Sequence, residues 1–300
     1  MTDVAGRTRT TGILAALSAV LIWAGWIPVT RWGVIGHLNP IDVTALRYGT
    51  SGLILLPFFW CHRHAVPWHR PGWLALIAVG AGAPYFLLFG MGLRLANSGQ
   101  AAVFGPGASS VFTLLLARIW LGESITLARA MGILCTVTGF AWVAGHDVLT
   151  GGARIGGFGL ILLASFAWST FTIASRRLAL PPLLTVAIVG VINAVWVWPL
   201  YVISGGPTRL AQAPLSAVLL QAGYQGILTG TLAMMAFTFA IGRLGAAGAA
   251  AFTPLTPVLA SVIGWWILGD GLDLATAVGL VAVAIGVVVG GGSIPRFKAT

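Results

Sequence analysis

Stretches of about 20 apolar residues follow one another along almost the whole chain, and this pattern restricts the possible folds more than any other feature. One helix of that length crosses the hydrocarbon core of a bilayer. The pattern leaves little room for charge: 16 basic and 6 acidic residues occur among 300, whereas about a quarter of the residues in a soluble domain are charged. The sequence therefore predicts an all-α integral membrane protein.

Ten apolar segments are long enough to span a membrane, and together they use most of the chain. Hydropathy places them at 12–31, 41–60, 72–93, 99–120, 127–145, 157–177, 182–203, 214–242, 246–268 and 274–292. The other residues suffice for two termini and short loops, so we expect no soluble domain. The eighth segment is long for one span, and Gly223, Gly226 and Gly230 are positions at which it could bend.

Basic residues are distributed unevenly between the two sides that these spans define. If the N-terminus is cytoplasmic, the cytoplasmic side carries Arg7, Arg9, Arg63, Arg70, Arg118, Arg129, Arg176, Arg177, Arg243, Arg296 and Lys298. The opposite side carries only Arg31, Arg94, Arg154 and Arg209. Because cytoplasmic loops are rich in Lys and Arg, we expect both termini in the cytoplasm. The net charge of +10 then reflects topology rather than a nucleic-acid surface.

The two halves of the sequence resemble each other. Residues 119–139 (IWLGESITLARAMGILCTVTG) align without a gap with residues 266–286 (WILGDGLDLATAVGLVAVAIG), which places Glu123 on Asp270. Each half holds five predicted spans. Because five is an odd number, the second copy must enter the membrane from the opposite side, so the sequence predicts an inverted repeat.

Inverted repeats are typical of transporters, because two copies of one fold in opposite orientations can exchange conformations around a central site. The predicted organisation is an N-terminal tail at 1–11, a first repeat at 12–146, a connection at 147–156, a second repeat at 157–292 and a C-terminal tail at 293–300.

A few positions of the two halves also carry a family resemblance. They are the Trp23–Arg31 and Trp168–Arg176 helices, Arg47, Pro257, and the LGE and LGD junctions. On these residues the chain resembles the EamA repeats of the drug/metabolite transporter superfamily over residues 12–292 and, within it, the YddG-type amino-acid exporters. Ser110 and Val189 depart from the pattern, since they stand where the repeats would match Pro257 and Arg47.

The resemblance implies an exporter of amino acids, aromatic and other neutral ones first, that works by alternating access in the bacterial inner membrane. We expect a small-molecule substrate and the lipid bilayer as partners, a monomer, no nucleic acid and no cofactor. An exporter of drugs or other small metabolites is the alternative, and a membrane-embedded enzyme is the alternative from another class.

The absence of certain charged residues from the middle of the spans limits the possible transport mechanisms. No Asp, Glu, Lys or His lies in the middle of a predicted span, although proton-coupled pumps usually need such a group. We therefore expect a neutral or zwitterionic substrate that moves down its gradient. The five histidines and two cysteines are dispersed, so we expect neither a metal site nor a catalytic centre.

Arg47 lies farther inside a predicted span than any other basic residue. It lies about 9 Å along its helix from the start of the span, and an intramembrane charge is a functional candidate. A guanidinium group can bind a substrate carboxylate through two hydrogen bonds. A structural role, in which Arg47 caps carbonyl groups or pairs with Asp42, is equally compatible with the sequence.

Aromatic and polar side chains deep in several spans could form a substrate pocket. The predicted substrate-binding residues are Trp23, Trp26, Arg47, Tyr85, Gln100, Trp168, Thr172, Tyr224 and Gln225. Ordinary helix packing is the alternative for any one of them, although polar atoms at this depth must find partners.

Helix-breaking residues recur at comparable depths in the fourth and ninth spans. The predicted breaks or gates are Gly105, Pro106, Gly107, Thr253, Pro254 and Pro257. Interrupted helices point to a binding site, whereas a packing kink is the alternative.

Overall fold

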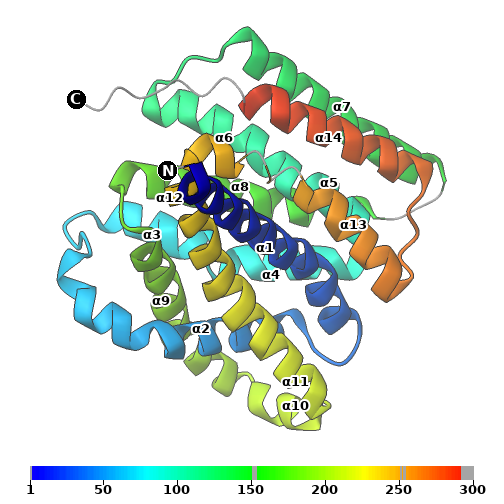
Figure 1. Cartoon of the computed structure of the whole chain (residues 1–300). Helices are drawn as coiled ribbons and strands as arrows, with labels where there is room; N and C mark the ends of the chain where they lie inside the picture. Colours follow the sequence, from blue (N-terminus) through cyan, green and yellow to red (C-terminus); the bar gives the residue numbers. More distant parts are fainter. Residues whose placement is uncertain (1, 151–153, 251, 253–254, 292–300) are drawn as a thin grey trace.

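The structure, a computed structural model, describes residues 2–150, 154–250, 252 and 255–291. Every regular element in these residues is a helix (Figure 1). The predicted all-α membrane fold is thereby confirmed. The predicted C-terminal tail at 293–300 lies outside the described residues.

The first half of the chain forms seven α-helices and one short 3-10 turn. The helices are α1 (Thr2–Ile35), α2 (Pro40–His62), α3 (Pro71–Gly80), α4 (Ala83–Leu95), α5 (Ser98–Phe104), α6 (Pro106–Leu121) and α7 (Leu127–Leu149), and the 3-10 turn is Arg63–Ala65. The first helix begins ten residues before the predicted span at 12–31.

The second half contains the matching set. Its helices are α8 (Ile155–Leu178), α9 (Pro182–Ile203), α10 (Gly206–Gln212), α11 (Leu215–Gln221), a π-helical segment (Ala222–Leu232), α12 (Ala233–Ala250), α13 (Leu255–Leu268) and α14 (Leu274–Gly291).

The predicted third span is broken into α3 and α4. The chain turns at Ala81 and Gly82, and a Cβ on Gly82 would lie 1.7 Å from the carbonyl oxygen of Ala78. Asn193 of α9 holds the break, because its amide group donates to the Ala78 carbonyl at 2.9 Å and accepts from the Ala83 N–H at 2.8 Å. Backbone groups freed inside a bilayer need such partners.

The predicted eighth and ninth spans have other boundaries in the structure. Between α11 and α12 the helix widens into its π-helical segment, which contains the three predicted glycines. Hydroxyl groups satisfy carbonyls there: Thr229 donates to Tyr224 and Gln225, and Thr231 donates to Gly226. The helix α12 then continues to Ala250, so the first residues assigned to the ninth span, 246–250, belong to α12. Six small residues, GAAGAA, carry no hydropathy signal that would mark this boundary.

Six helical segments of the described residues are long and apolar enough to cross a membrane. They are Thr10–Ile35, Pro71–Leu95, Ser98–Leu121, Leu127–Leu149, Ile155–Leu178 and Pro182–Ile203. Shorter apolar helices run over Leu255–Leu268 and Leu274–Gly290.

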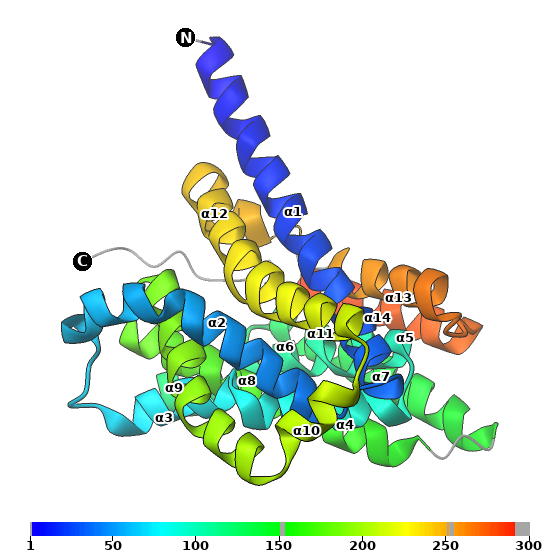
Figure 2. The same ribbon diagram turned by 90° about the horizontal axis from the view of Figure 1, so that it is seen from below.

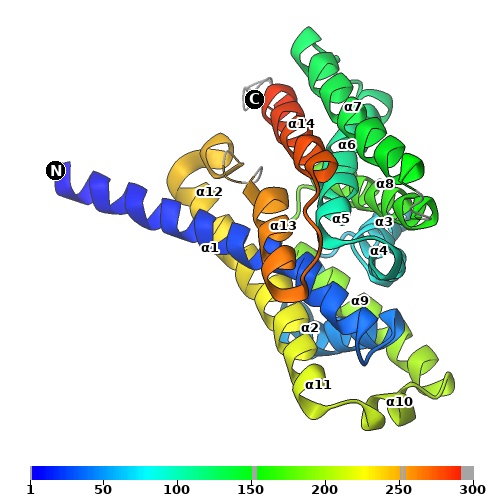
Figure 3. The ribbon, with the colours of Figure 1, turned by 90° about the vertical axis from the view of Figure 1, so that its right-hand side faces the viewer.

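Helix pairs from the two halves pack in a matching pattern. The helix α2 packs along α9, and α7 packs along α14 (Figures 1 and 3). The helix α1 packs against α12 and α13, while α8 packs against α3, α4 and α6 in the corresponding way. Figure 2 shows that the N-terminal part of α1 leads away from the rest of the bundle, with α12 beside it.

Glycines permit the closest of these approaches. A Cβ on Gly132 of α7 would lie 2.6 Å from the carbonyl oxygen of Gly286 on α14. Small residues let helix backbones come together in this way inside a membrane. The paired helices of the two halves can therefore pack backbone to backbone.

Candidate functional site

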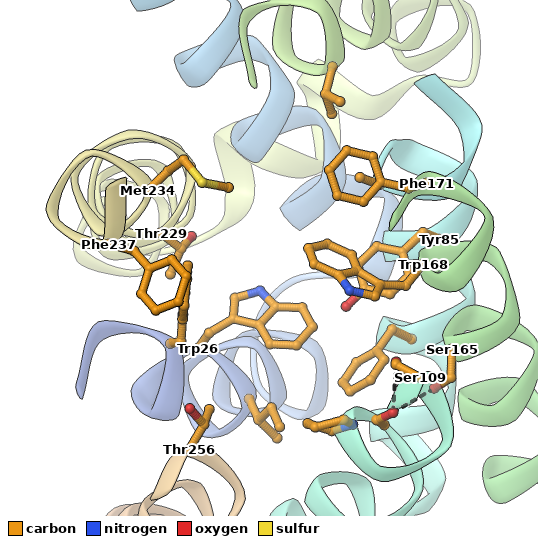
Figure 4. Close-up of a pocket in the computed structure, with 18 of the residues that line it drawn as sticks. Trp26, Tyr85, Ser109, Ser165, Trp168, Phe171, Thr229, Met234, Phe237 and Thr256 are labelled. Atoms are coloured by element: carbon orange, nitrogen blue, oxygen red, sulfur yellow. Dashed lines mark hydrogen bonds between the residues drawn. The ribbon is translucent and has the colours of Figure 1, made fainter. Parts of the chain in front are cut away.

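A cavity of about 500 Å³ lies between helices of both halves. Ligand pockets commonly have about 300–1,000 Å³. Its walls come from Trp23, Trp26, Ile27, Arg47, Tyr48, Ser51, Ala81, Tyr85, Phe89, Gly105, Pro106, Ser109, Ser110, Ser165, Trp168, Phe171, Val186, Val189, Gly190, Thr229, Gly230, Met234, Phe237, Thr256, Pro257, Val283, Ala284 and Val287. Figure 4 shows the side chains that surround this central cavity.

Five aromatic rings form one continuous wall of the central cavity. The Trp26 ring of α1 stacks on Tyr85 of α4 at 6.2 Å between centroids and lies 4.8 Å from Phe89. Tyr85 in turn contacts Trp168 of α8 at 5.2 Å, and Trp168 contacts Phe171 at 5.0 Å. These rings come from three helices, so the wall exists only when both halves are packed together.

The side of the cavity across from Tyr85 and Trp168 comes from the π-helical segment and α12. Thr229, Met234 and Phe237 lie there, with Trp26 between them and the rings of Tyr85 and Trp168 (Figure 4). Phe237 also contacts Trp23, at 5.0 Å between ring centroids. A solute in the cavity would therefore lie between apolar surfaces.

Arg47 carries the only formal charge among the residues that line the central cavity in the described part of the chain. Its Nη1 donates to Gln225 Oε1 at 3.1 Å and to Thr229 Oγ1 at 3.0 Å. The guanidinium carbon lies 5.1 Å from the centre of the Phe86 ring. These contacts hold the guanidinium group at the cavity wall without neutralising it.

The local sequence explains how Arg47 comes to this position. Pro40 begins α2 after Asn39, and the Asp42 carboxylate accepts the Asn39 N–H in a capping box. Asp42 also accepts from the Tyr201 hydroxyl and the Arg209 guanidinium group. The acid considered as a partner for Arg47 is thus engaged at the end of the helix.

A second wall feature is the break between α5 and α6 at Gly105. Pro106 has no N–H to continue the helix, and the hydroxyl groups of Ser109 and Ser165 donate to the Gly105 carbonyl at 2.9 and 3.0 Å. Gly105, Pro106 and Pro257 line the cavity.

Gly107, also proposed as a break residue, is not among the described residues that line the cavity. Gly107 faces Val283 of α14, with 2.8 Å between that side chain and a Cβ built on the glycine. Thr253 and Pro254 lie outside the described residues.

The structure brings five of the predicted binding residues to the central cavity: Trp23, Trp26, Arg47, Tyr85 and Trp168. Gln100 instead belongs to the capping box at the start of α5 and donates to Asp147 at 3.4 Å. The Tyr224 hydroxyl donates to the Ile22 carbonyl, and Gln225 bridges Arg47 and Thr30. The side chains of these three residues form hydrogen bonds with other parts of the protein, and the three residues do not line the cavity.

Several lining residues were not predicted from the sequence. Phe89 lies one helical turn after Tyr85, and Phe171 lies three residues after Trp168, so helical spacing from the predicted residues could have identified both. Phe237 follows the π-helical segment, which changes the phase of the helix. No sequence signal indicates that the Phe237 side chain faces the cavity.

A second cavity of about 470 Å³ adjoins the first; we call it the vestibule. It shares Ser109, Ser110, Trp168 and Val287 with the central cavity, and its other walls come from α6, α7, α8, α14 and the connection between α6 and α7. It contains the predicted residue Thr172 and three charged residues. They are Glu123, Arg129 and Arg176.

A network around Arg31 lies at the opposite end of the bundle, and because none of its residues lines either cavity we call this the closed end. This guanidinium group pairs with Asp270 at 3.1 Å and donates to the carbonyl oxygen of Ala96 at 2.6 Å. The Asp270 carboxylate also accepts the Ser98 N–H at the start of α5, at 2.8 Å. The network joins α1, α4, α5 and the end of α13.

Comparison with known proteins gives relatives along nearly the whole chain. The transporter YyaM of Bacillus subtilis (strain 168) is 23% identical over 88% of this chain and 89% of its own. The aromatic amino acid exporter YddG of Salmonella typhimurium is 24% identical over 91% of this chain and 94% of its own. A probable terminal-alkyne amino-acid exporter of Streptantibioticus cattleyicolor is 24% identical over 86% of each chain.

A solved crystal structure shares the fold. It superposes with a TM-score of 0.59 at 21% identity, and the match covers 94% of this chain and 96% of that one. The EamA-like transporter family matches residues 10–145 and 155–290, one match in each half. The chain therefore belongs to the EamA-like transporter family, as a membrane protein with two EamA repeats.

Proposed function

We propose that this transporter exports neutral amino acids, aromatic ones first, by alternating access and without proton coupling. The observation that carries the proposal is Arg47, a single cation on the wall of an otherwise apolar and aromatic cavity. A cavity with one fixed positive charge favours a solute that brings a carboxylate.

The guanidinium group is arranged to receive such a carboxylate. Gln225 and Thr229, both uncharged, accept from its Nη1, and no carboxylate of the described residues lines the cavity, so its positive charge is left for a solute. A carboxylate held by two guanidinium N–H groups is bound tightly and in a fixed orientation. Arg47 would thus anchor the polar end of the solute.

The rest of the cavity suits the other groups of an amino acid. Trp26, Tyr85 and Trp168 offer ring faces that attract an ammonium group, and Ser109 and Ser110 add hydroxyl oxygens. An apolar or aromatic side chain can pack against Phe237 and Met234. In the described residues no carboxylate lines this cavity, which disfavours a cationic drug as the substrate.

The relatives support the same solute class. One is named as an exporter of aromatic amino acids and another as a probable exporter of terminal-alkyne amino acids. We place the protein in the bacterial inner membrane as a monomer, with both termini and the vestibule on the cytoplasmic side. This orientation follows from the excess of basic residues at that side.

Transport in liposomes tests the proposal. We expect counterflow of radiolabelled tryptophan, phenylalanine and leucine without a proton gradient, and we expect Arg47→Gln to lower its rate at least about tenfold, because a charge-assisted contact is lost. Arg118→Gln is the matched control, since Arg118 is an exposed arginine at the end of α6.

The outcomes separate the alternatives. Flux of cationic dyes with no amino-acid flux would give first place to a drug exporter. Flux only with an imposed proton gradient would overturn the uncoupled mechanism. Covalent change of the solute by protein in detergent would indicate an enzyme.

A further inference from the structure

We propose that the vestibule is an entry site, in which Arg176 captures the carboxylate of the solute before it reaches the central cavity. The inference rests on the proposed function and adds a second binding site to it. It is carried by the charges at the vestibule mouth and by the path that joins the two cavities.

The charges at the vestibule mouth do not balance. The single carboxylate of Glu123 is paired with two guanidinium groups, Arg129 at 3.1 Å and Arg176. Two positive charges and one negative charge leave one positive charge in excess. An anionic group entering this end of the bundle is therefore attracted to it.

The excess charge resides on Arg176 rather than on Arg129. The side chain of Arg129 is 4% exposed, and its Nη1 is shared between Glu123 and the Ser124 carbonyl. The side chain of Arg176 is 39% exposed and donates to Glu123 through Nη2 alone. Arg129 neutralises the carboxylate from the buried side, which leaves the Arg176 guanidinium group able to bind a second carboxylate.

One face of α8 leads from this charge to the central cavity. Arg176, Thr172 and Trp168 are separated by four residues each and all line the vestibule, so they form a stripe about 12 Å long. Ser109 and Ser110 of α6 line both cavities. A solute released by Arg176 therefore meets hydroxyl groups and then the Trp168 ring that belongs to the aromatic wall.

The equivalent end of the second repeat does not have this excess. There, within the described part of the chain, Asp270 pairs with Arg31 alone, and the position aligned with Arg129 is Thr276. The imbalance is therefore specific to the vestibule. A charge needed only to tie two helices together would have required one arginine, as at the other end.

Transport from each side separately tests the inference. We would measure uptake into inside-out vesicles, whose medium faces the vestibule, and into right-side-out vesicles. We expect Arg176→Gln to raise the KM for phenylalanine about tenfold in inside-out vesicles and less than about twofold in right-side-out vesicles. Arg176→Lys should restore most of the affinity, and Arg118→Gln should change neither value.

Two further measurements do not depend on that variant being well folded. Raising the ionic strength should raise the KM of the unmodified protein on the vestibule side, because exposed charges are screened beyond about 8 Å at physiological salt. Phenylalanine amide, which lacks the carboxylate, should inhibit phenylalanine uptake only weakly from this side, and its inhibition should not weaken as the ionic strength rises.

The entry site and the proposed function fail in different ways. Equal changes of KM on both sides with Arg176→Gln, or no change on either, would overturn the entry site while amino-acid flux and its loss with Arg47→Gln remain. Absence of amino-acid flux in unmodified vesicles of both orientations would overturn the proposed function and the entry site together.

Discussion

The two ends of the bundle carry the same ion pair in opposite circumstances. Arg31 and Asp270 are aligned by the repeat with Arg176 and Glu123, and each pair joins one half of the chain to the other. The Arg31 side chain is 16% exposed, whereas that of Arg176 is 39% exposed. The same pair thus closes one end and leaves the other accessible.

The two ion pairs differ in the backbone groups that form hydrogen bonds with them. Arg31 donates to the carbonyls of Leu93 and Ala96, and Asp270 accepts from the Ser98 N–H. Among the described residues, Arg176 bonds only to Glu123. An ion pair alone does not seal an end; the seal forms here because the end of α4 supplies free carbonyl groups and the start of α5 supplies a free N–H group.

Removing the acid of the closed end should have the largest effect. Asp270→Asn leaves the mostly buried Arg31 without an anionic partner, and breaking a buried pair costs about 3–5 kcal/mol. We expect the closed end to open. Labelling of Ser110→Cys by an impermeant thiol reagent from outside the cell should rise at least about tenfold, in a chain with Cys61 and Cys135 replaced by serine.

The charge-reversed pair is the control for this experiment. Arg31→Asp combined with Asp270→Arg restores the ion pair but not the bonds to the Leu93 and Ala96 carbonyls and the Ser98 N–H, so labelling should stay high. Unchanged labelling in Asp270→Asn would mean that packing, rather than the ion pair, holds this end closed.

Packing at the closed end should give an intermediate effect. A Cβ on Gly264 of α13 would lie 2.4 Å from the Ser98 Cβ of α5, so Gly264→Val forces these helices apart at a cost of about 1–3 kcal/mol. We expect outside labelling of Ser110→Cys to increase and transport to slow. Gly271→Val is the matched control, because a Cβ there meets nothing within 4 Å. Similar effects of the two substitutions would contradict the view that Gly264→Val acts by forcing α13 and α5 apart.

The smallest effect is expected at Thr276, which replaces Arg129 in the repeat. Its hydroxyl is buried without a hydrogen-bond partner among the described residues, so Thr276→Val removes a group that gains nothing from folding. The midpoint of thermal unfolding in detergent should stay equal or rise slightly. Thr136→Val should lower it, because that hydroxyl donates to the Gly132 carbonyl at 2.9 Å. A fall for Thr276→Val would show that its hydroxyl has a partner.

The sequence predicted those parts of the fold and site that depend on local chemistry. Apolar length predicted the helices, and the gap-free match of the halves predicted the repeats. Trp26, Trp168 and Arg47 are predicted from the sequence because burying an indole N–H or a guanidinium group in a span costs free energy unless it has a partner. All three line the central cavity, and their contact with a solute remains a prediction.

Long-range partners account for what the sequence did not reveal. Gln100, Tyr224 and Gln225 were proposed because polar atoms in a span need partners, but protein groups far along the chain supply those partners here. A polar side chain inside a span needs a hydrogen-bond partner whether that partner is another part of the protein or a solute, so the sequence alone does not distinguish the two. The break at Gly82 was missed for a related reason, since its partner is Asn193, more than a hundred residues away.

That distance has a consequence for biogenesis. The Ala78 carbonyl and the Ala83 N–H both bond to the amide of Asn193, yet α9 is synthesised long after the segment Pro71–Leu95. Until α9 enters the bilayer, the break between α3 and α4 exposes two backbone groups that lipid cannot solvate. The third span therefore reaches its final shape only after the seventh has been inserted, and a ribosome that stops before Asn193 leaves a first repeat that is complete in sequence but incomplete in structure.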